Sequence, residues 1–164
     1  MLIDKRRFVA MVEAQSPTCY RVARAILRNH EDCRDALQEA ILKAWAARHK
    51  LRDEALFATW LTRIVIRECR NLQRRGRKYD LAAEVEPAQS QAAHAASDTW
   101  DALDALPDKL RLPLILHHVE GYAIQEIAGM LHLPQSTVRG RLYQARGAMR
   151  LELTDEEGVT HHDA

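Results

Sequence analysis

Apolar residues recur at helical spacing along most of this chain, and no stretch shows the sustained apolar–polar alternation of a half-buried strand. The clearest pattern lies between Gly121 and Leu151. In its first half, four apolar residues fall at i, i+3, i+4 and i+7: Ile124, Ile127, Ala128 and Leu131. After a break at 132–134, four more fall at i, i+4, i+7 and i+11: Val138, Leu142, Ala145 and Met149. Two amphipathic helices joined by so short a turn predict a helix-turn-helix.

The second of these helices is predicted to carry a polar, cationic side. At about 100° per residue, the side opposite the apolar stripe holds Ser136, Gly140, Tyr143, Gln144 and Gly147. Arginines lie along its edges: Arg139, Arg146 and Arg150 on one and Arg141 on the other. A hydrogen-bonding surface with cationic edges suits a major groove walled by phosphates. The alternative is an ordinary solvated helix with scattered arginines.

Apolar spacing in the first half of the chain predicts four helices. The first covers residues 4–14, and the second runs from Pro17 to about Arg28 with Ser16 as its N-cap. The third begins around Asp32, and its broad apolar side holds Ala36, Leu37, Ala40, Ile41, Ala44 and Trp45. Its outer side carries Asp35, Gln38 and Glu39. Taken singly, these three residues are typical of a solvated helix surface.

The fourth helix, from about Ala55 to Arg75, combines an apolar side with a stripe of arginines. The apolar side holds Leu61, Val65, Cys69 and Leu72 at i, i+4, i+8 and i+11. The opposite side holds Arg63, Arg67, Arg70 and Arg74 at i, i+4, i+7 and i+11. Like charges at this spacing repel, and a polyanion along this side would relieve the repulsion. Trp60 and Asn71 lie beside the stripe and offer a stacking surface and a base-reading amide. The alternative is a solvated basic surface.

Helical periodicity is lost from about Arg77 to Ser97, where Ala, Gln, Glu and Ser dominate, and this predicts a linker. Beyond it, Pro107 and Asp108 mark a helix start, and the apolar segment that follows ends at Gly121 as a C-cap. The predicted fold class is all-α, with two small helical domains joined by a flexible linker and the helix-turn-helix in the second. The predicted ranges are 1–76 and 99–153 for the domains, 77–98 for the linker and 154–164 for an acidic tail.

Composition and charge narrow the function further. Of the 164 residues, 47% are hydrophobic and 5% aromatic, which suits small cores. No apolar run approaches the length of a membrane span, so we expect a cytoplasmic protein. Residues 1–80 hold 18 Lys/Arg and 10 Asp/Glu, whereas residues 81–164 hold 6 and 13. A polyanion would therefore meet the first half broadly and the second half through one helix.

Metal and redox chemistry have little support in the spacing. Cys19, Cys33 and Cys69 are far apart and form no CxxC pair, so we expect reduced thiols, with a redox role left open. His117-His118 with Glu120 suggests a metal site. Adjacent residues point to different sides of a helix, however, and no further ligand follows at suitable spacing. We expect no metal, no cofactor, no small-molecule substrate and no catalytic residue.

Taken together, these blocks resemble the extracytoplasmic-function (ECF) group of bacterial RNA polymerase sigma factors. The segments DCRDALQEAILKAW and FATWLTRIVIRECRNLQRR are similar to the family's domain two, and LDALPDKLRLPLILHHVEGYAIQEIAGMLHLPQSTVRGRLYQAR is similar to its domain four. The resemblance covers nearly the whole chain. It implies a protein that binds core RNA polymerase, recognises the minus-10 and minus-35 elements of promoter DNA and assists strand opening. It also implies an anti-sigma partner, which in this family is often membrane-anchored.

The resemblance also implies roles for individual residues. Asp35, Gln38 and Glu39 match the family's D-x-x-Q-E pattern, which binds the polymerase clamp. The loop from Leu51 to Ala55, with Phe57, corresponds to the segment that captures a flipped minus-10 base. The minus-10 residues implied are Arg52, Asp53, Phe57, Trp60, Arg63, Arg67, Arg70, Asn71 and Arg74. The minus-35 residues implied are Gln135, Ser136, Thr137, Arg139, Gly140, Arg141, Tyr143, Gln144 and Arg146.

Four positions depart from the family pattern. Arg67 stands where asparagine is common, Gly140 where serine is frequent and Gln144 where a basic residue is frequent, while His132 occupies a turn position often held by glycine. These departures bear on the promoter sequence rather than on the activity.

Two alternatives come from other functional classes. A stand-alone regulator that binds an operator as a dimer explains neither the D-x-x-Q-E surface nor a second basic domain. A small metal-dependent enzyme using His117, His118 and Glu120 lacks a convergent ligand set.

Overall fold

The computed structural model describes the main chain of residues 2–82 and 98–159, and the side chains of residues 2–76 and 99–150. Every regular element in these ranges is helical. The chain divides into two compact units, within residues 1–92 and 93–164. The predicted fold class is therefore confirmed, whereas most of the predicted linker, 83–97, lies outside the described residues. None of the described helices combines the length and apolar character that a membrane span requires.

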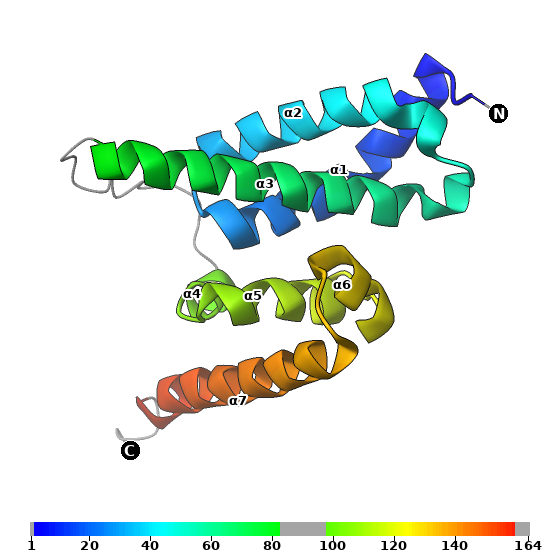
Figure 1. The fold of residues 1–164 in the computed structure, drawn as a ribbon. Helices are drawn as coiled ribbons and strands as arrows, with labels where there is room; N and C mark the ends of the chain where they lie inside the picture. The colour runs from blue at the N-terminus through cyan, green and yellow to red at the C-terminus, as the bar shows by residue number, and fades with distance from the viewer. Residues whose placement is uncertain (1, 83–97, 160–164) are drawn as a thin grey trace. The chain divides into compact units, whose positions relative to one another are not determined.

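In the first unit, three helices pack against one another in pairs (Figure 1). They are α1 Lys5–Leu27, α2 His30–Ala47 and α3 Phe57–Ala82, with the short turns η1 Arg48–Lys50 and η2 Glu54–Leu56 between α2 and α3. The core holds several small residues: Ala23, Ala25, Ala36, Ala40 and Ala44. Small side chains at a contact shorten the distance between helix axes. The larger apolar volume of this core comes from α3 residues such as Leu61, Val65 and Ile66.

The prediction of two helices before residue 28 is wrong, because α1 is one continuous helix with Pro17 inside it. Proline lacks the N–H of a helical hydrogen bond and normally bends or breaks a helix interior. Here the segments on both sides of Pro17 bury residues in the same core, Phe8 before it and Cys19 and Val22 after it. Ser16 does not cap a new helix, since its hydroxyl donates to the carbonyl of Val12 at 2.9 Å. Tertiary packing therefore outweighs the local stop signal.

Two helices extend further than their apolar periodicity predicts. We expected α3 to end near Arg75, but its main chain stays helical to Ala82. Likewise α7, Gln135–Val159, continues into the segment expected to be an acidic tail. The residues added to both helices contain no proline and include good helix formers, so the backbone can remain helical without an apolar side.

The second unit has four α-helices and one π-helical turn in its described residues. They are α4 Asp98–Asp104, α5 Asp108–Leu114, η3 Ile115–Val119, α6 Ile124–Leu131 and α7. The helices α4, α5 and α6 all contact α7. Leu116, Ile127, Val138 and Leu142 are almost completely buried where these elements meet. The core therefore includes the two apolar stripes that predicted the helix-turn-helix.

The segment around Pro113 differs from an ordinary helix. We expected Pro113 to cost little if it lay in the first turn, but it lies near the end of α5. The chain then widens into the π turn η3, where the N–H of Glu120 donates to the carbonyl of Ile115 at 3.0 Å. Gly121 follows with a φ of 77°, so the predicted glycine C-cap is present. A left-handed backbone at this position favours glycine because glycine has no Cβ.

The turn between α6 and α7 has the short helix-turn-helix geometry. His132 adopts the left-handed conformation, with a φ of 55°, and the N–H of Leu133 donates to the carbonyl of Ala128 at 3.0 Å. This is the position where the family often has glycine, and the positive φ is the physical reason for that preference. The predicted helix-turn-helix is therefore confirmed. Its turn contains His132 in the left-handed conformation, which is unfavourable for residues that carry a Cβ.

Candidate functional site

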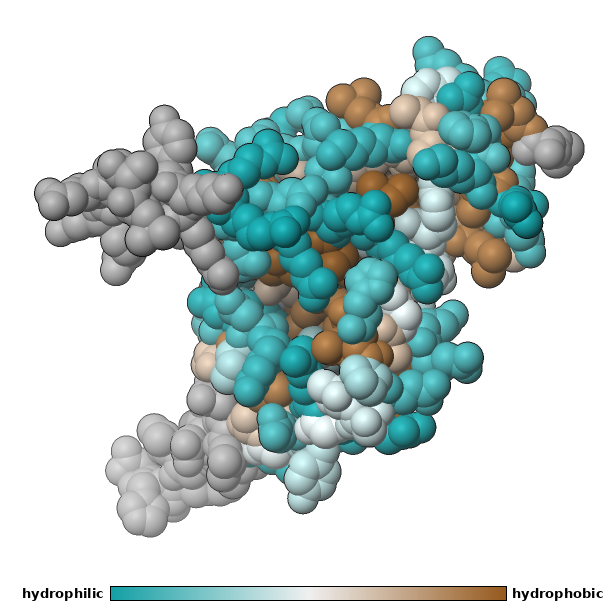
Figure 2. Space-filling view, in the orientation of Figure 1, coloured by the Kyte–Doolittle hydropathy of each residue, from teal (hydrophilic) through white to brown (hydrophobic). Residues whose placement is uncertain are grey.

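The arginine stripe of α3 lies on the surface of the first unit. Arg63, Arg67, Arg70 and Arg74 are all exposed, whereas Leu61, Val65 and Cys69 on the other side are at most 1% exposed. In Figure 2, hydrophilic residues cover most of the side of α3 that faces the viewer. Arg74 donates to the side-chain oxygen of Asn71, which orients the amide beside the stripe. The predicted separation of an apolar side from a cationic side is thus present in the structure.

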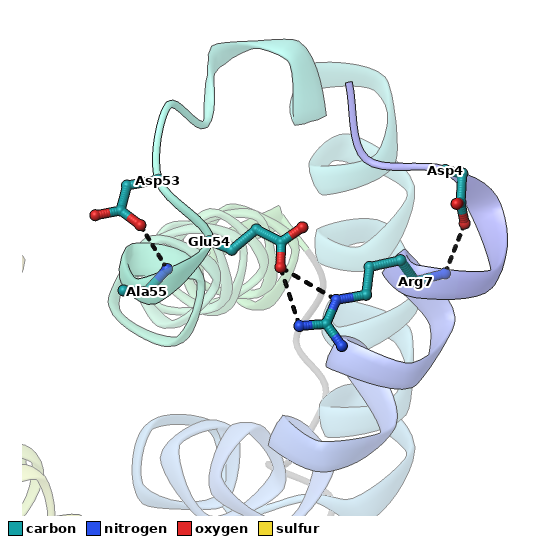
Figure 3. Close-up of polar contacts among 5 residues, drawn as sticks. All are labelled: Asp4, Arg7, Asp53, Glu54 and Ala55. Carbon is teal, nitrogen blue, oxygen red and sulfur yellow. Dashed lines mark hydrogen bonds and ion pairs between the residues drawn. The ribbon is translucent and has the colours of Figure 1, made fainter. Parts of the chain in front are cut away.

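The loop before α3 is closed by hydrogen bonds and an ion pair. Asp53 accepts a hydrogen bond from the N–H of Ala55 at 2.9 Å and so caps η2. The next residue, Glu54, is paired with Arg7 of α1 (Figure 3). Arg52 and Asp53 are exposed, and Leu51 anchors the start of the loop at 8% exposure. The loop therefore presents polar side chains to solvent while both of its ends are held.

Phe57 belongs to the core of the first unit. Its side chain is 3% exposed. The centroid of its ring lies 5.9 Å from the centroid of the Phe8 ring and 5.9 Å from that of the Trp60 ring. A ring enclosed in this way has no surface open to a nucleotide base in this conformation. The neighbouring Leu56 is 57% exposed and lies on the loop. Leu56 was not among the predicted site residues, although two successive apolar residues at a helix start indicate that one of them points outward.

An exposed polar face on α2 contains the residues of the D-x-x-Q-E pattern. Asp35, Gln38 and Glu39 are exposed, and Leu42, further along the same helix, is 64% exposed. Leu42 lies one turn beyond Gln38 and Glu39 and adds an apolar group to this face. It was not among the predicted site residues. Charged and apolar groups together are typical of protein-binding surfaces.

A lysine connects this face with α3. The ammonium of Lys43 lies 2.8 Å from Glu68 and 3.8 Å from Glu39. Glu68 is only 3% exposed although it carries a carboxylate, and it lines a groove together with Asp35, Ala36, Glu39, Leu72 and Arg75. A buried carboxylate requires a partner, and Lys43 supplies it. Lys43 thus links the polar face of α2 to the arginine-bearing helix.

The first turn of α2, before the D-x-x-Q-E residues, holds a carboxyl group whose pKa is shifted. The pKa of Asp32 is raised, first by burial and then by the nearby charges of Asp35 and Glu31. After burial, the acids around Asp32 contribute to this raised pKa because their negative charges disfavour a further carboxylate beside them. Acids in the first helical turn are also favoured by the helix dipole.

In the second unit, α7 presents the polar side that its sequence predicts. The exposed members of the proposed reading set are Gln135, Ser136, Arg139, Gly140, Tyr143, Gln144 and Arg146, while Thr137 and Arg141 are half-buried. The side chain of Tyr143 is 77% exposed, more than that of any other large hydrophobic residue in the described ranges. Val138, Leu142 and Ala145 are at most 1% exposed on the other side. A helix with one side packed and the other side polar and cationic fits a major groove.

The histidine pair contacts protein groups. His117 Nδ1 lies 2.9 Å from the carbonyl oxygen of Tyr122, and His118 Nε2 lies 3.4 Å from a guanidinium nitrogen of Arg146. Burial, then His117 and Arg146, lower the pKa of His118. Within the described residues, no three His, Cys, Asp or Glu side chains come together in a group that could hold a metal ion. His118 instead helps to place a candidate DNA-binding arginine.

The three cysteines are buried thiols outside any disulfide, one on each helix of the first unit. Burial raises the pKa of Cys33 to about 11 and that of Cys69 further. A thiol with a raised pKa and no exposure is a poor nucleophile. In the described conformation these cysteines therefore act as small core residues.

The family models that this chain matches are those of sigma factors, and so are the curated relatives named below. Residues 11–79 match the family model of Sigma-70 region 2, and residues 98–149 match that of Sigma-70 region 4. The RNA polymerase sigma factor SigV of Bacillus subtilis is 28% identical over 157 residues, covering 93% of this chain and 95% of SigV. The ECF RNA polymerase sigma factor SigM of Mycobacterium tuberculosis is 31% identical over 150 residues, covering 89% of this chain and 76% of SigM.

Two solved structures share the fold. The sigma factor RpoE of Bartonella quintana, solved with the anti-sigma factor NepR, superposes with a TM-score of 0.77 at 21% identity, over 90% of this chain and 96% of RpoE. CnrH, solved with the cytosolic domain of CnrY, gives a TM-score of 0.69 at 24% identity, over 93% of this chain and 90% of CnrH. The two matched regions, the relatives and the helix-turn-helix lead to one conclusion: this chain belongs to the ECF subfamily of RNA polymerase sigma factors.

Proposed function

We propose that the two units divide the work of a sigma factor between them. The first unit joins core RNA polymerase and holds the opened minus-10 element, and the second unit reads the minus-35 element. The observation that carries this division is the presence of one exposed cationic helix in each unit, α3 and α7, beside a separate acidic face on α2. We retain the ranges 1–76 and 99–153 for the two functional domains. The protein itself catalyses no reaction in this scheme and acts in the cytoplasm.

Core polymerase is proposed to bind the face of α2 that carries Asp35, Gln38 and Glu39. Their exposed polar groups, with exposed Leu42 on the same helix, supply both the charge that orients a partner and an apolar contact at the interface. Because this face is on α2 and the arginine stripe is on α3, polymerase and DNA can occupy the first unit at the same time.

Minus-10 DNA is proposed to lie along α3 and the loop before it. The stripe of four arginines neutralises phosphates, and Trp60 and Asn71 lie beside it for stacking and base contact. The loop carrying Arg52 and Asp53 receives the extruded base. In place of the buried Phe57, exposed Leu56 supplies the apolar surface of that contact.

An inhibitory protein partner is proposed on separate grounds. RpoE was solved with the anti-sigma factor NepR, and CnrH with the cytosolic domain of CnrY. An anti-sigma protein for this chain would occlude the polymerase or promoter surface, so we expect it to compete with core polymerase for the same sigma molecules.

A reconstitution experiment tests the proposed function. Purified protein is mixed with core RNA polymerase and a library of promoter DNA, and initiation is measured by sequencing the transcripts. We expect initiation at a restricted set of promoters that share two elements. Glu39→Ala should lower affinity for core polymerase and leave minus-35 binding unchanged, whereas Arg139→Ala should do the reverse.

The result that contradicts the proposal is a folded protein that binds duplex DNA tightly at low salt but never binds core polymerase. That outcome supports a stand-alone helix-turn-helix regulator instead. Equal loss of both activities in Glu39→Ala and in Arg139→Ala would show that the two surfaces are assigned wrongly. Thermal unfolding of each variant separates this outcome from misfolding.

A further inference from the structure

Arg7 of α1 and Glu54 of η2 form an ion pair that spans 47 residues of sequence (Figure 3). Both Nε and Nη2 of Arg7 donate to the same oxygen of Glu54, at 3.1 and 3.0 Å. Because both donors reach one oxygen, two charge-assisted hydrogen bonds hold the position of that oxygen. Glu54 is the first residue of η2 and lies within the loop 51–55. Its position therefore determines how the loop leaves the core.

The arginine is itself placed by the first turn of α1. Asp4 caps this helix by accepting a hydrogen bond from the N–H of Arg7 at 2.8 Å. The next residue, Phe8, is buried and packs its ring edge-on against Trp45 and Phe57, with centroid distances of 5.1 and 5.9 Å. The same helical turn thus makes two contacts: Phe8 packs against Phe57, just after the loop, and Arg7 pairs with Glu54, within the loop. The capped turn is a rigid base for the ion pair.

The pair contributes little to the stability of the fold. The side chains of Arg7 and Glu54 are 58% and 35% exposed, and ion pairs with such access to water add little free energy to folding. The pair nevertheless ties Glu54 of the loop to α1, while the other polar loop residues, Arg52 and Asp53, are exposed. The structural consequence of the pair is local, since it limits the conformations open to the loop.

We propose that Arg7 and Glu54 are positioning residues that hold the loop 51–55 in the shape that receives the extruded minus-10 base. This inference rests on the proposed role of that loop. Preorganising a binding loop reduces the ordering cost at the moment of binding. The pair also neutralises the carboxylate of Glu54 close to the path of an anionic strand. Loss of either partner frees the loop, and its affinity for single-stranded minus-10 DNA falls.

The test compares variants whose charge effects have opposite signs. Arg7→Met removes a cation and Glu54→Gln removes an anion, so simple attraction of DNA predicts weaker binding for the first and stronger binding for the second. Positioning predicts that both variants bind more weakly. Full-length sigma variants are assembled with core polymerase, and binding of a fluorescent single-stranded minus-10 oligonucleotide and the rate of promoter opening are measured. We expect both to fall by roughly twofold to fivefold, the range that a solvent-exposed ion pair can supply.

Two further variants complete the design. Arg6→Met removes the same charge from the neighbouring exposed position and is expected to retain wild-type loop function. The exchange Arg7→Glu with Glu54→Arg restores a pair in reverse order and should recover most of the lost affinity. Affinity for core polymerase and the temperature of unfolding are expected to remain unchanged in all variants.

Three outcomes overturn the inference. They are unchanged oligonucleotide binding in both single variants, opposite effects of Arg7→Met and Glu54→Gln, or equal losses in Arg7→Met and Arg6→Met. Each of these outcomes is judged against a wild-type holoenzyme that binds the oligonucleotide. If the wild-type holoenzyme itself binds core polymerase but not the oligonucleotide, the proposed role of the loop fails, and the inference fails with it.

Discussion

The guanidinium of Arg111, on α5, donates from Nε to the main-chain carbonyl of Leu103, on α4, at 2.9 Å. Its Nη2 donates to the carbonyl of Leu106 at 2.7 Å, and its Nη1 is paired with Asp108 at 3.0 Å. Arg111 is 0% exposed, so this charge is solvated by the protein. The carbonyl of Leu103, in the last turn of α4, also accepts the N–H of Leu106 at 3.1 Å, and the buried cation adds a second donor to it. The residue joins α4 to α5 at the point where the second unit begins.

Arg111→Met is expected to destabilise the second unit. The variant removes the guanidinium from the carbonyl of Leu106 and leaves the carbonyl of Leu103 with the N–H of Leu106, at a cost of about 3–5 kcal/mol. A loss of this size is comparable to the whole stability of a small domain. Thermal unfolding and hydrogen exchange of the full chain should show early opening of the second unit while the first stays folded. Lys109→Met, at an exposed position of the same helix, is the control, and equal effects of the two changes would contradict the explanation.

Lys43→Met should be destabilising because it leaves Glu68 as a buried carboxylate without its ammonium partner. Lys43 is 48% exposed, so water replaces part of the interaction, and we expect a loss of about 1–3 kcal/mol in the free energy of unfolding. Glu68→Gln in the same chain should recover most of this loss, since the amide carries no charge. Urea unfolding of the two single variants and the double variant measures the coupling. Additive effects of the two changes would show that the pair is unimportant.

Gly140→Ala is expected to stabilise α7 and alter DNA recognition. A Cβ at position 140 meets no atom within 4 Å, and alanine in a helix interior is favoured over glycine by about 0.5–1 kcal/mol. Gly147→Ala is the matched control, because its Cβ also enters open space. Urea unfolding should show similar gains for both variants. Selection from a minus-35 library should show a changed base preference for Gly140→Ala, and an unchanged preference would remove position 140 from the reading surface.

Stability should fall at alkaline pH because of the buried thiol of Cys33. Burial raises its pKa from 9.0 to about 11. Between these values the unfolded chain releases the thiol proton and the folded chain retains it, so the free energy of unfolding decreases as pH rises. The protonated Cys33 thiol therefore stabilises the fold fully below pH 9, and this stabilisation is lost by about pH 11. The loss in the free energy of unfolding is roughly 2–3 kcal/mol in total. Urea unfolding across this range should show a shallower decline for Cys33→Ala than for the wild type. Parallel declines would contradict this account.

The local patterns determined most of the helices and their buried sides. Four apolar residues from Ile124 to Leu131 and four from Val138 to Met149 predicted the helix-turn-helix, because helical periodicity is a property of neighbouring residues. The same reasoning separated the arginine stripe of α3 from its core. The resemblance to the family then identified the protein class, which the matched regions confirm.

Start and stop signals were less decisive than periodicity. Ser16-Pro17 predicted a helix boundary, yet α1 continues through it. The signal is local, whereas the free energy that keeps α1 intact comes from packing against both α2 and α3. A single-sequence pattern contains no information about how strongly distant helices hold a segment.

The spacing of apolar and basic residues along the chain was enough to predict a two-part helical protein with one cationic helix surface in each part. Which polar residues are internal and which loop residues are exposed depends instead on how the helices pack. Packing buried Glu68 beside Lys43 and Arg111 beneath α4, turned Phe57 inward and Leu56 outward, and joined Arg7 to Glu54. These outcomes depend on contacts between residues that come together only when helices pack, so no local pattern encodes them.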